Sequence, residues 1–171
     1  MEKTVELRNG RKVVVRPMAT DDVVRSLAFF RDLPEDDRVY LRADVTRPEV
    51  IQRRLDRIER GELHCLVVLD GDRIVADGAL ERDRREWKSH LAEMRLFVAP
   101  SHRRLGLGTL LSREVYGIAL EENLEELVVR MMRPQEAVRS IVERLGFHED
   151  AVLEGYVRDM HGDRQDLVIM R

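Results

Sequence analysis

The stretch from Arg103 to Thr109 is the part of the sequence best suited to chemistry. It reads Arg-Arg-Leu-Gly-Leu-Gly-Thr and lies between a strand-like segment ending at Pro100 and a segment with helical spacing of leucines. The first N–H groups of a helix have no intrahelical partner, glycines let a ligand approach the backbone, and arginines add positive charge. We therefore expect an anionic ligand here, best one that carries a di- or polyphosphate.

Two nucleotide-binding motifs do not fit this stretch. A dinucleotide fingerprint needs a third glycine, but Leu111 stands three positions after Gly108. A P-loop needs a lysine before Ser or Thr, and the stretch contains no lysine. A tight turn in which the glycines serve only the backbone geometry stays open as an alternative.

The surrounding elements predict a mixed α/β protein. Hydrophobic periodicity and turn residues predict strands over 4–7, 12–16, 64–69, 73–80, 89–98, 126–132, 147–157 and 166–170. Helices are predicted over 21–30, 105–120 and 135–145, and from a capping box at Thr46–Glu49 through Ile58. Pro34–Arg38 is predicted as a loop. Because no repeat or linker interrupts the chain, residues 1–171 are predicted to form a single domain.

The composition excludes several classes of protein. Of 171 residues, 43% are hydrophobic and 37% charged, and the formal net charge of −3 argues against a protein that mainly coats nucleic acid or anionic membrane. A single cysteine excludes an internal disulfide, and the five histidines show no metal-ligand spacing. No apolar run approaches the ~20 residues of a membrane span. Residues 1–16 lack the apolar centre of a signal peptide, so we expect a cytoplasmic protein.

Arg103-Arg104-Leu105-Gly106-Leu107-Gly108 resembles the Arg/Gln-x-x-Gly-x-Gly/Ala acetyl-CoA loop of the GNAT superfamily of N-acetyltransferases. Residues 137–147, which end in Leu-Gly-Phe, resemble the family's penultimate helix, and residues 155–159 and 166–170 resemble its final hairpin. The resemblance implies the GNAT acyl-CoA N-acyltransferase fold, a central, mixed, mostly antiparallel sheet flanked by helices. It also implies acetyl-CoA as the donor.

The resemblance places acetyl-CoA on two adjoining segments. In the family a backbone N–H of the strand before the loop binds the thioester carbonyl, which implies the region of Leu96, Phe97 and Val98. The loop and the helix start imply a phosphate site at Arg103, Arg104, Leu105, Gly106, Leu107, Gly108 and Thr109.

A narrower resemblance concerns the acceptor. Arg38-Val39-Tyr40-Leu41-Arg42 resembles an arginine- and tyrosine-containing segment of bacterial protein-lysine acetyltransferases, which implies that Arg38, Tyr40 and Arg42 shape the acceptor side. The same domains carry a glutamate on the strand before the acetyl-CoA loop. In this chain Glu93 holds that position.

Glu93 is the predicted general base. An amine must be neutral to attack a thioester, and an ordinary lysine has a pKa near about 10.4, so a carboxylate must take its proton. A solvated glutamate paired with Arg95, on the same face of the strand, stays open as the alternative. Because the family mechanism is direct attack in a ternary complex, Cys65, inside an apolar run, is predicted to be a buried core thiol.

One departure from the family concerns the leaving thiolate. Val142 stands where many members have a tyrosine that protonates the thiolate, although the lysine-acetylating group commonly lacks it. Tyr156 substitutes only if the last hairpin brings it to the sulfur, and water is the other proton source. Tyr116 is predicted to be structural.

Arg53, Arg54, Arg57 and Arg60 are predicted to form a solvated, ion-paired helix face. Trp87 is either an acceptor contact or an exposed aromatic.

Together these features predict an acetyl-CoA-dependent N-acetyltransferase whose acceptor is a protein lysine. We expect a monomer or homodimer that needs no metal and binds neither nucleic acid nor membrane. The alternatives are a small-amine or N-terminal α-amine acetyltransferase, and a non-catalytic acyl-CoA-sensing module.

Overall fold

The computed structural model describes residues 2–41, 43–82 and 86–171. In chain order the elements are β1 (Lys3–Glu6), β2 (Lys12–Pro17), η1 (Thr20–Asp22), α1 (Val23–Asp32), α2 (Glu35–Arg38), α3 (Pro48–Glu59), β3 (Leu63–Asp70), β4 (Arg73–Arg82), η2 (Glu86–Lys88), β5 (Leu91–Val98), η3 (Pro100–His102), α4 (Leu107–Glu121), β6 (Glu126–Met132), α5 (Glu136–Arg144), β7 (Glu149–Arg158) and β8 (Arg164–Met170). The strands and long helices confirm the predicted order.

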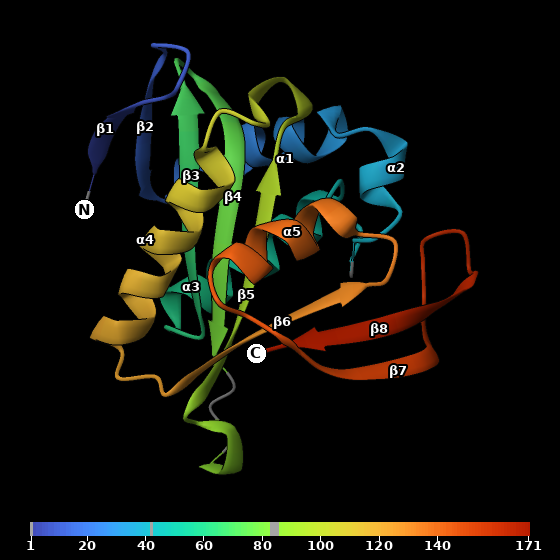
Figure 1. Ribbon diagram of the computed structural model, residues 1–171. Coiled ribbons are helices and arrows are strands. Elements are labelled where there is room, and N and C mark those ends of the chain that lie inside the picture. The colour runs from blue at the N-terminus through green and yellow to red at the C-terminus, as the bar shows by residue number, and fades with distance from the viewer. Residues whose placement is uncertain (1, 42, 83–85) are drawn as a thin grey trace.

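The strands form one mixed sheet in the order β1-β2-β3-β4-β5-β6-β8-β7 (Figure 1). Every pair of neighbours is antiparallel except β5 and β6, which run parallel. A parallel pair needs a long crossover connection, and α4 supplies it. The predicted fold class, a mostly antiparallel mixed sheet flanked by helices, is confirmed.

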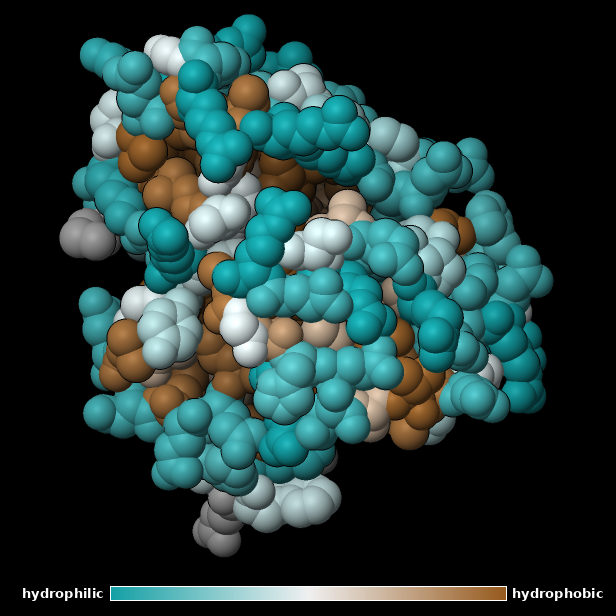
Figure 2. All heavy atoms as spheres, in the orientation of Figure 1, coloured by the Kyte–Doolittle hydropathy of each residue, from teal (hydrophilic) through white to brown (hydrophobic). Residues whose placement is uncertain are grey.

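Helices cover both faces of the sheet. α4 and α5 lie on one face and α1 and α3 on the other (Figure 1), with a separate apolar core under each layer. On the α4 side, Gly78 faces Leu111 so closely that an added Cβ would lie 2.7 Å from the leucine Cγ. The absence of a side chain at this strand position therefore lets α4 approach the sheet. Figure 2 shows the face with α4 and α5, where apolar atoms are visible mainly in recesses between hydrophilic side chains.

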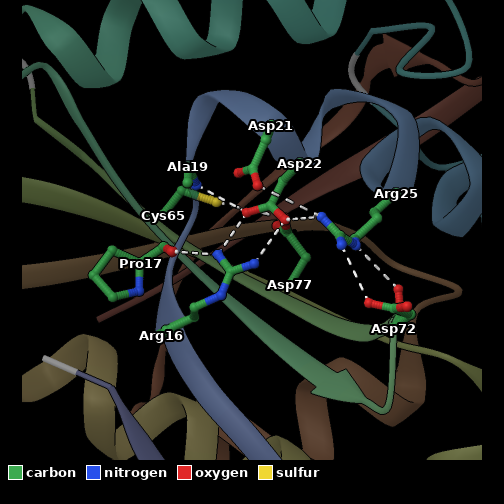
Figure 3. Close-up of polar contacts among 9 residues, drawn as sticks. All are labelled: Arg16, Pro17, Ala19, Asp21, Asp22, Arg25, Cys65, Asp72 and Asp77. Atoms are coloured by element: carbon green, nitrogen blue, oxygen red, sulfur yellow. Dashed lines mark hydrogen bonds and ion pairs between the residues drawn. The ribbon is translucent and has the colours of Figure 1, made fainter.

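A buried ion pair fixes the beginning of α1 to β2 (Figure 3). Both guanidinium Nη atoms of Arg16 donate to the Asp22 carboxylate, at 2.6 and 2.8 Å, and the Ala19 N–H donates to it at 2.9 Å. Arg25 approaches the same carboxylate at 3.5 Å and bridges to Asp72. Burial acts to raise the pKa of Asp22, but the hydrogen bonds from Arg16 and Ala19 outweigh it, so the pKa lies below its ordinary value.

Two local predictions were wrong. Residues 35–38, predicted as loop, form the single-turn helix α2, where three acidic residues in the first turn are favourable next to the positive helix end. The capping box at Thr46–Glu49 does not form, because the Thr46 hydroxyl bonds to the Asp44 carboxylate instead. Arg47 is the N-cap of α3, and Pro48 takes the first helical position, where its missing N–H costs nothing.

Candidate active site

The central feature of the sheet is a separation of β5 from β6. Their parallel ladder consists of three pairs and ends at Glu93 opposite Val128, after which β6 pairs with β8 instead. A cavity of about 430 Å³ lies in the opening. Its lining comes from α3, from β4, β5 and β6, from α5 and from the segment between α2 and α3. The splayed strands thus create a site that reaches into the sheet itself.

The backbone of β5 faces this opening with polar groups. The Ala99 N–H donates to the Val75 oxygen on β4, and directions alternate along a strand, so the N–H groups of Leu96 and Val98 point away from β4 toward the opening. The Val98 oxygen, on the same side, accepts a hydrogen bond from Arg103 Nε at 3.2 Å. The side chains of Leu96 and Phe97 line the cavity. Such N–H groups are suited to a developing oxyanion.

The predicted phosphate loop has the geometry of an anion site. Arg104 and Gly106 have φ of 62° and 87°, in the left-handed region, and α4 begins at Leu107. Left-handed residues before a helix direct consecutive N–H groups toward one point, where the helix dipole also acts. Leu107 anchors the helix because its side chain is buried in the core. At Gly108 an added Cβ would lie 3.1 Å from Ile141 Cδ1, so a side chain there would crowd α5.

Three arginines surround this loop. Arg103 pairs with Asp37 at 2.6 Å, whereas Arg104 is exposed. Arg8 lies across Gly106, with its Nε 3.5 Å from where a Cβ would stand. Sequence reasoning missed Arg8, because only the folded β1–β2 hairpin brings it to the loop. Leu105 and Thr109, the remaining predicted loop residues, are half-buried.

Glu93 lies at the vertex of the splayed strands. It is buried, and its carboxylate lies 3.2 Å from a guanidinium nitrogen of Arg130 on β6. Arg95, the partner considered from the sequence, has an ion pair with Glu81 of β4. Glu93 lines a second cavity of about 310 Å³ that adjoins the first, since Arg57 and Arg130 line both. Sequence reasoning had no signal for Arg130, which is 37 positions away.

The residues predicted to shape the acceptor side do not all lie at the cavity. Tyr40 lines the 430 Å³ cavity, in an apolar rim with Leu41, Val45 and Val50. Arg38 does not line it, and its buried Nε has no hydrogen-bond partner among the described residues. Arg42 lies outside the described residues.

The arginines of α3 form ion pairs as predicted, but the prediction that their face is solvated was wrong for most of them. Arg53, Arg54 and Arg57 line the cavity, because α3 packs this side against the sheet; only Arg60 remains outside it. Arg54 donates to Asp77 Oδ1 at 2.6 Å.

Cys65 lies behind Arg54, whose Nη2 is 2.8 Å from the sulfur. Burial raises the pKa of the Cys65 thiol well above its ordinary value, and the nearby guanidinium offsets this only in part. The thiol is therefore a buried core group, as the sequence indicates.

Tyr40 lines the cavity, but the position where many family members have a tyrosine carries none. Val142 is fully buried and lines the cavity, so the family's tyrosine position does face the site. Tyr156 is 68% exposed and Tyr116 is 54% exposed, and neither lines the cavity. Trp87 is 73% exposed and stacks only with Lys88 among the described residues.

Within residues 2–41, 43–82 and 86–171, no group of three or more acidic, histidine or cysteine side chains is arranged to hold a metal ion. In the same part of the chain no helix is long and apolar enough to cross a membrane.

A mixed sheet with splayed central strands, next to a glycine- and arginine-rich helix start, defines a coenzyme-A-dependent N-acyltransferase fold. The family model of the Acetyltransferase (GNAT) family matches residues 27–147, and the chain belongs to this family. It is thus an acetyltransferase of the family that uses acetyl-CoA. No curated protein sequence matches the chain.

Solved structures agree on the fold and differ in acceptor. Ribosomal-protein-alanine N-acetyltransferase from Brucella melitensis is 22% identical with a TM-score of 0.79, over 91% of this chain and 96% of that one. The GNAT domain of S. lividans PAT is 17% identical with a TM-score of 0.77, over 98% and 95%. Spermidine N-acetyltransferase from Vibrio cholerae, in complex with CoA and spermine, is 17% identical with a TM-score of 0.76, over 92% and 93%.

Proposed function

We propose that this enzyme transfers an acetyl group from acetyl-CoA to a lysine side chain of a protein, by direct attack in a ternary complex. The observation that carries the proposal is the cavity between β5 and β6, which has apolar lining residues and adjoins a second cavity lined by the buried carboxylate of Glu93. The bond between acetyl carbon and sulfur breaks, the bond to the lysine nitrogen forms, and CoA leaves as a thiol.

The residues present fit acetyl-CoA. The N–H groups at the start of α4, with Arg104 and Arg8 beside them, would hold its phosphates. Bound there, acetyl-CoA supplies an electrophilic thioester. The N–H groups of Leu96 and Val98 would stabilise the charge that develops on its carbonyl oxygen.

Glu93 accepts the proton of the lysine ammonium in this proposal. The buried Glu93 carboxylate lines the 310 Å³ cavity that adjoins the opening, and Arg130 orients it through their ion pair. Such a base contributes about 10²–10⁴-fold to the rate. Since Val142 carries no acidic proton, the leaving thiolate takes its proton from water.

The rim of the cavity favours a lysine side chain over an α-amine. Tyr40, Leu41, Val45 and Val50 give a rim that suits a methylene stem, while the charged end reaches inward. An N-terminal amine lacks such a stem and would bring peptide groups into this apolar passage. Acetylation of an N-terminal amine is the second candidate, because a ribosomal-protein-alanine acetyltransferase shares the fold.

The test is incubation of the enzyme with isotope-labelled acetyl-CoA and a cell lysate, followed by mass spectrometry of the proteins. We expect label on lysine ε-amines. Label confined to N-terminal α-amines would replace the first candidate by the second, and label confined to small amines would contradict both.

A further inference from the structure

Two adjoining cavities at the opening between β5 and β6 are lined by an excess of positive charge. The 430 Å³ cavity and its 310 Å³ neighbour adjoin at Arg57 and Arg130, and together they are called the trough. Its cationic side chains are Arg53, Arg54, Arg57, Arg82, Lys88, Arg95 and Arg130. Its carboxylates are only Asp77, Glu81 and Glu93.

Ion pairs do not remove this excess. Among the described residues, the pairs within the trough include Arg54–Asp77, Arg57–Glu81, Arg95–Glu81 and Arg130–Glu93. Behind the lining, Glu62 pairs with Arg57 and Glu122 with Arg82. When these two carboxylates are included, cations still exceed carboxylates by two among the described residues. Arg53, exposed on α3, has no carboxylate of the described chain within ion-pair distance.

The cofactor does not account for these arginines. The anion site at the start of α4 has its own cations, and none of the residues from Arg103 to Thr109 lines either cavity. The acetyl group and the adjoining arm of acetyl-CoA carry no charge, so nothing of the donor inside the sheet needs this field. The positive charge of the trough therefore faces the acceptor.

We propose that the enzyme selects acceptor lysines that have aspartate or glutamate residues as near neighbours in the sequence. The inference rests on the proposed function. A flexible acidic segment laid along the trough would place carboxylates beside Arg53 and the neighbouring guanidiniums while its lysine enters through the apolar rim. The same positive field favours the neutral, nucleophilic form of the amine. A polyamine, with its additional positive charges, would be repelled.

The experiment compares three peptides of equal length that are blocked at both ends and contain one lysine, flanked by Glu, by Gln or by Arg. Release of CoA gives kcat/KM for each. We expect the Glu peptide to exceed the Gln peptide by about tenfold, and the Gln peptide to exceed the Arg peptide, with smaller ratios at higher salt. Equal values, or a preference for the Arg peptide, would overturn the inference while leaving lysine acetylation intact. Acetylation of none of the three would instead count against the proposed function.

Variants of Arg53 connect the preference to the trough. Arg53→Glu should reduce the ratio of kcat/KM for the Glu peptide to kcat/KM for the Arg peptide at least severalfold, or invert the preference. The change should come mainly through KM. The matched control is Arg73→Gln, which removes a guanidinium that pairs with Asp32 outside both cavities and should leave the ratio unchanged. If Arg53→Glu leaves the ratio as it was, or if free glutamate is a better acceptor than the Glu peptide, the acidic-peptide inference is wrong.

Discussion

The carboxylate of Glu93, the last residue of β5 that pairs with β6, lies 3.2 Å from the guanidinium of Arg130, two positions beyond the last paired residue of β6. The ion pair joins the strands at the point where they separate. It also lies where the two cavities meet, since Arg130 lines both. Arg130 thus holds this carboxylate beside the 310 Å³ cavity, from which it can meet an acceptor amine.

Glu93→Gln should keep acetyl-CoA binding within about threefold and reduce kcat by about 10²–10⁴-fold near pH 7, because the amide keeps the shape but cannot accept the proton. Calorimetry with acetyl-CoA and CoA release with a lysine peptide measure the two effects. The control Glu59→Gln, at the exposed end of α3, should behave as wild type.

The pH dependence separates a base from a structural residue. The residual rate of Glu93→Gln should rise about tenfold per pH unit below the lysine pKa of about 10.4, since only free amine reacts. A variant with the same pH profile as wild type would show that Glu93 does not act as the base.

Gly108→Val should weaken acetyl-CoA binding at least tenfold, because its Cβ would lie 3.1 Å from Ile141 Cδ1 and its side chain would fill the approach to the helix start. The matched control is Gly117→Ala in the same helix, where an added Cβ would meet no described atom within 4 Å outside the neighbouring backbone of that helix. The control should bind acetyl-CoA normally and gain about 0.5–1 kcal/mol in unfolding free energy. Normal acetyl-CoA affinity in Gly108→Val would refute the placement of the phosphates.

Asp22→Asn should destabilise the fold by about 3 kcal/mol at pH 7, because it leaves the largely buried Arg16 guanidinium without its charge partner. Asp21→Asn, at an exposed carboxylate 3.8 Å from Arg25, should cost less than about 1 kcal/mol. Urea unfolding of the three proteins measures the difference.

Lowering the pH should remove the contribution of Asp22 to the stability of the fold. Since its pKa is lowered in the folded state, the ionised carboxylate stabilises the fold fully above the ordinary pKa of 3.8, and this stabilisation is lost as the pH falls through the folded value. The gap in stability between wild type and Asp22→Asn should therefore shrink below about pH 4. A gap that stays constant down to pH 2 would contradict the assignment.

Cys65 should not react with iodoacetamide in the native enzyme, because it is buried and its raised pKa leaves almost no thiolate near neutral pH. Mass spectrometry after alkylation, and after rapid quenching of turnover, should find neither label nor acetyl group on the thiol. An acetylated Cys65 formed at the rate of turnover would replace direct attack by a covalent mechanism.

The sequence predicted the features that local rules control. Strands such as 126–132 have the expected bounds, because an apolar run ended by Pro134 has few alternatives. The loop at Gly106 was found for a similar reason, since glycine adopts the left-handed conformation before α4 without steric cost. Local rules failed at Thr46, where a neighbouring carboxylate competes for the hydroxyl that would cap α3.

By itself, then, the sequence determined the order of the elements and predicted a phosphate loop and the candidate base Glu93, because each depends on residues close together in the chain. Only the tertiary structure decided what surrounds them. Arg53, Arg54 and Arg57 have the same spacing on a solvated helix as on a cavity wall, and the packing of α3 on the sheet makes them the latter. The pairing of Glu93 with Arg130 likewise needs two strands that meet across the α4 crossover, a contact that no local pattern encodes.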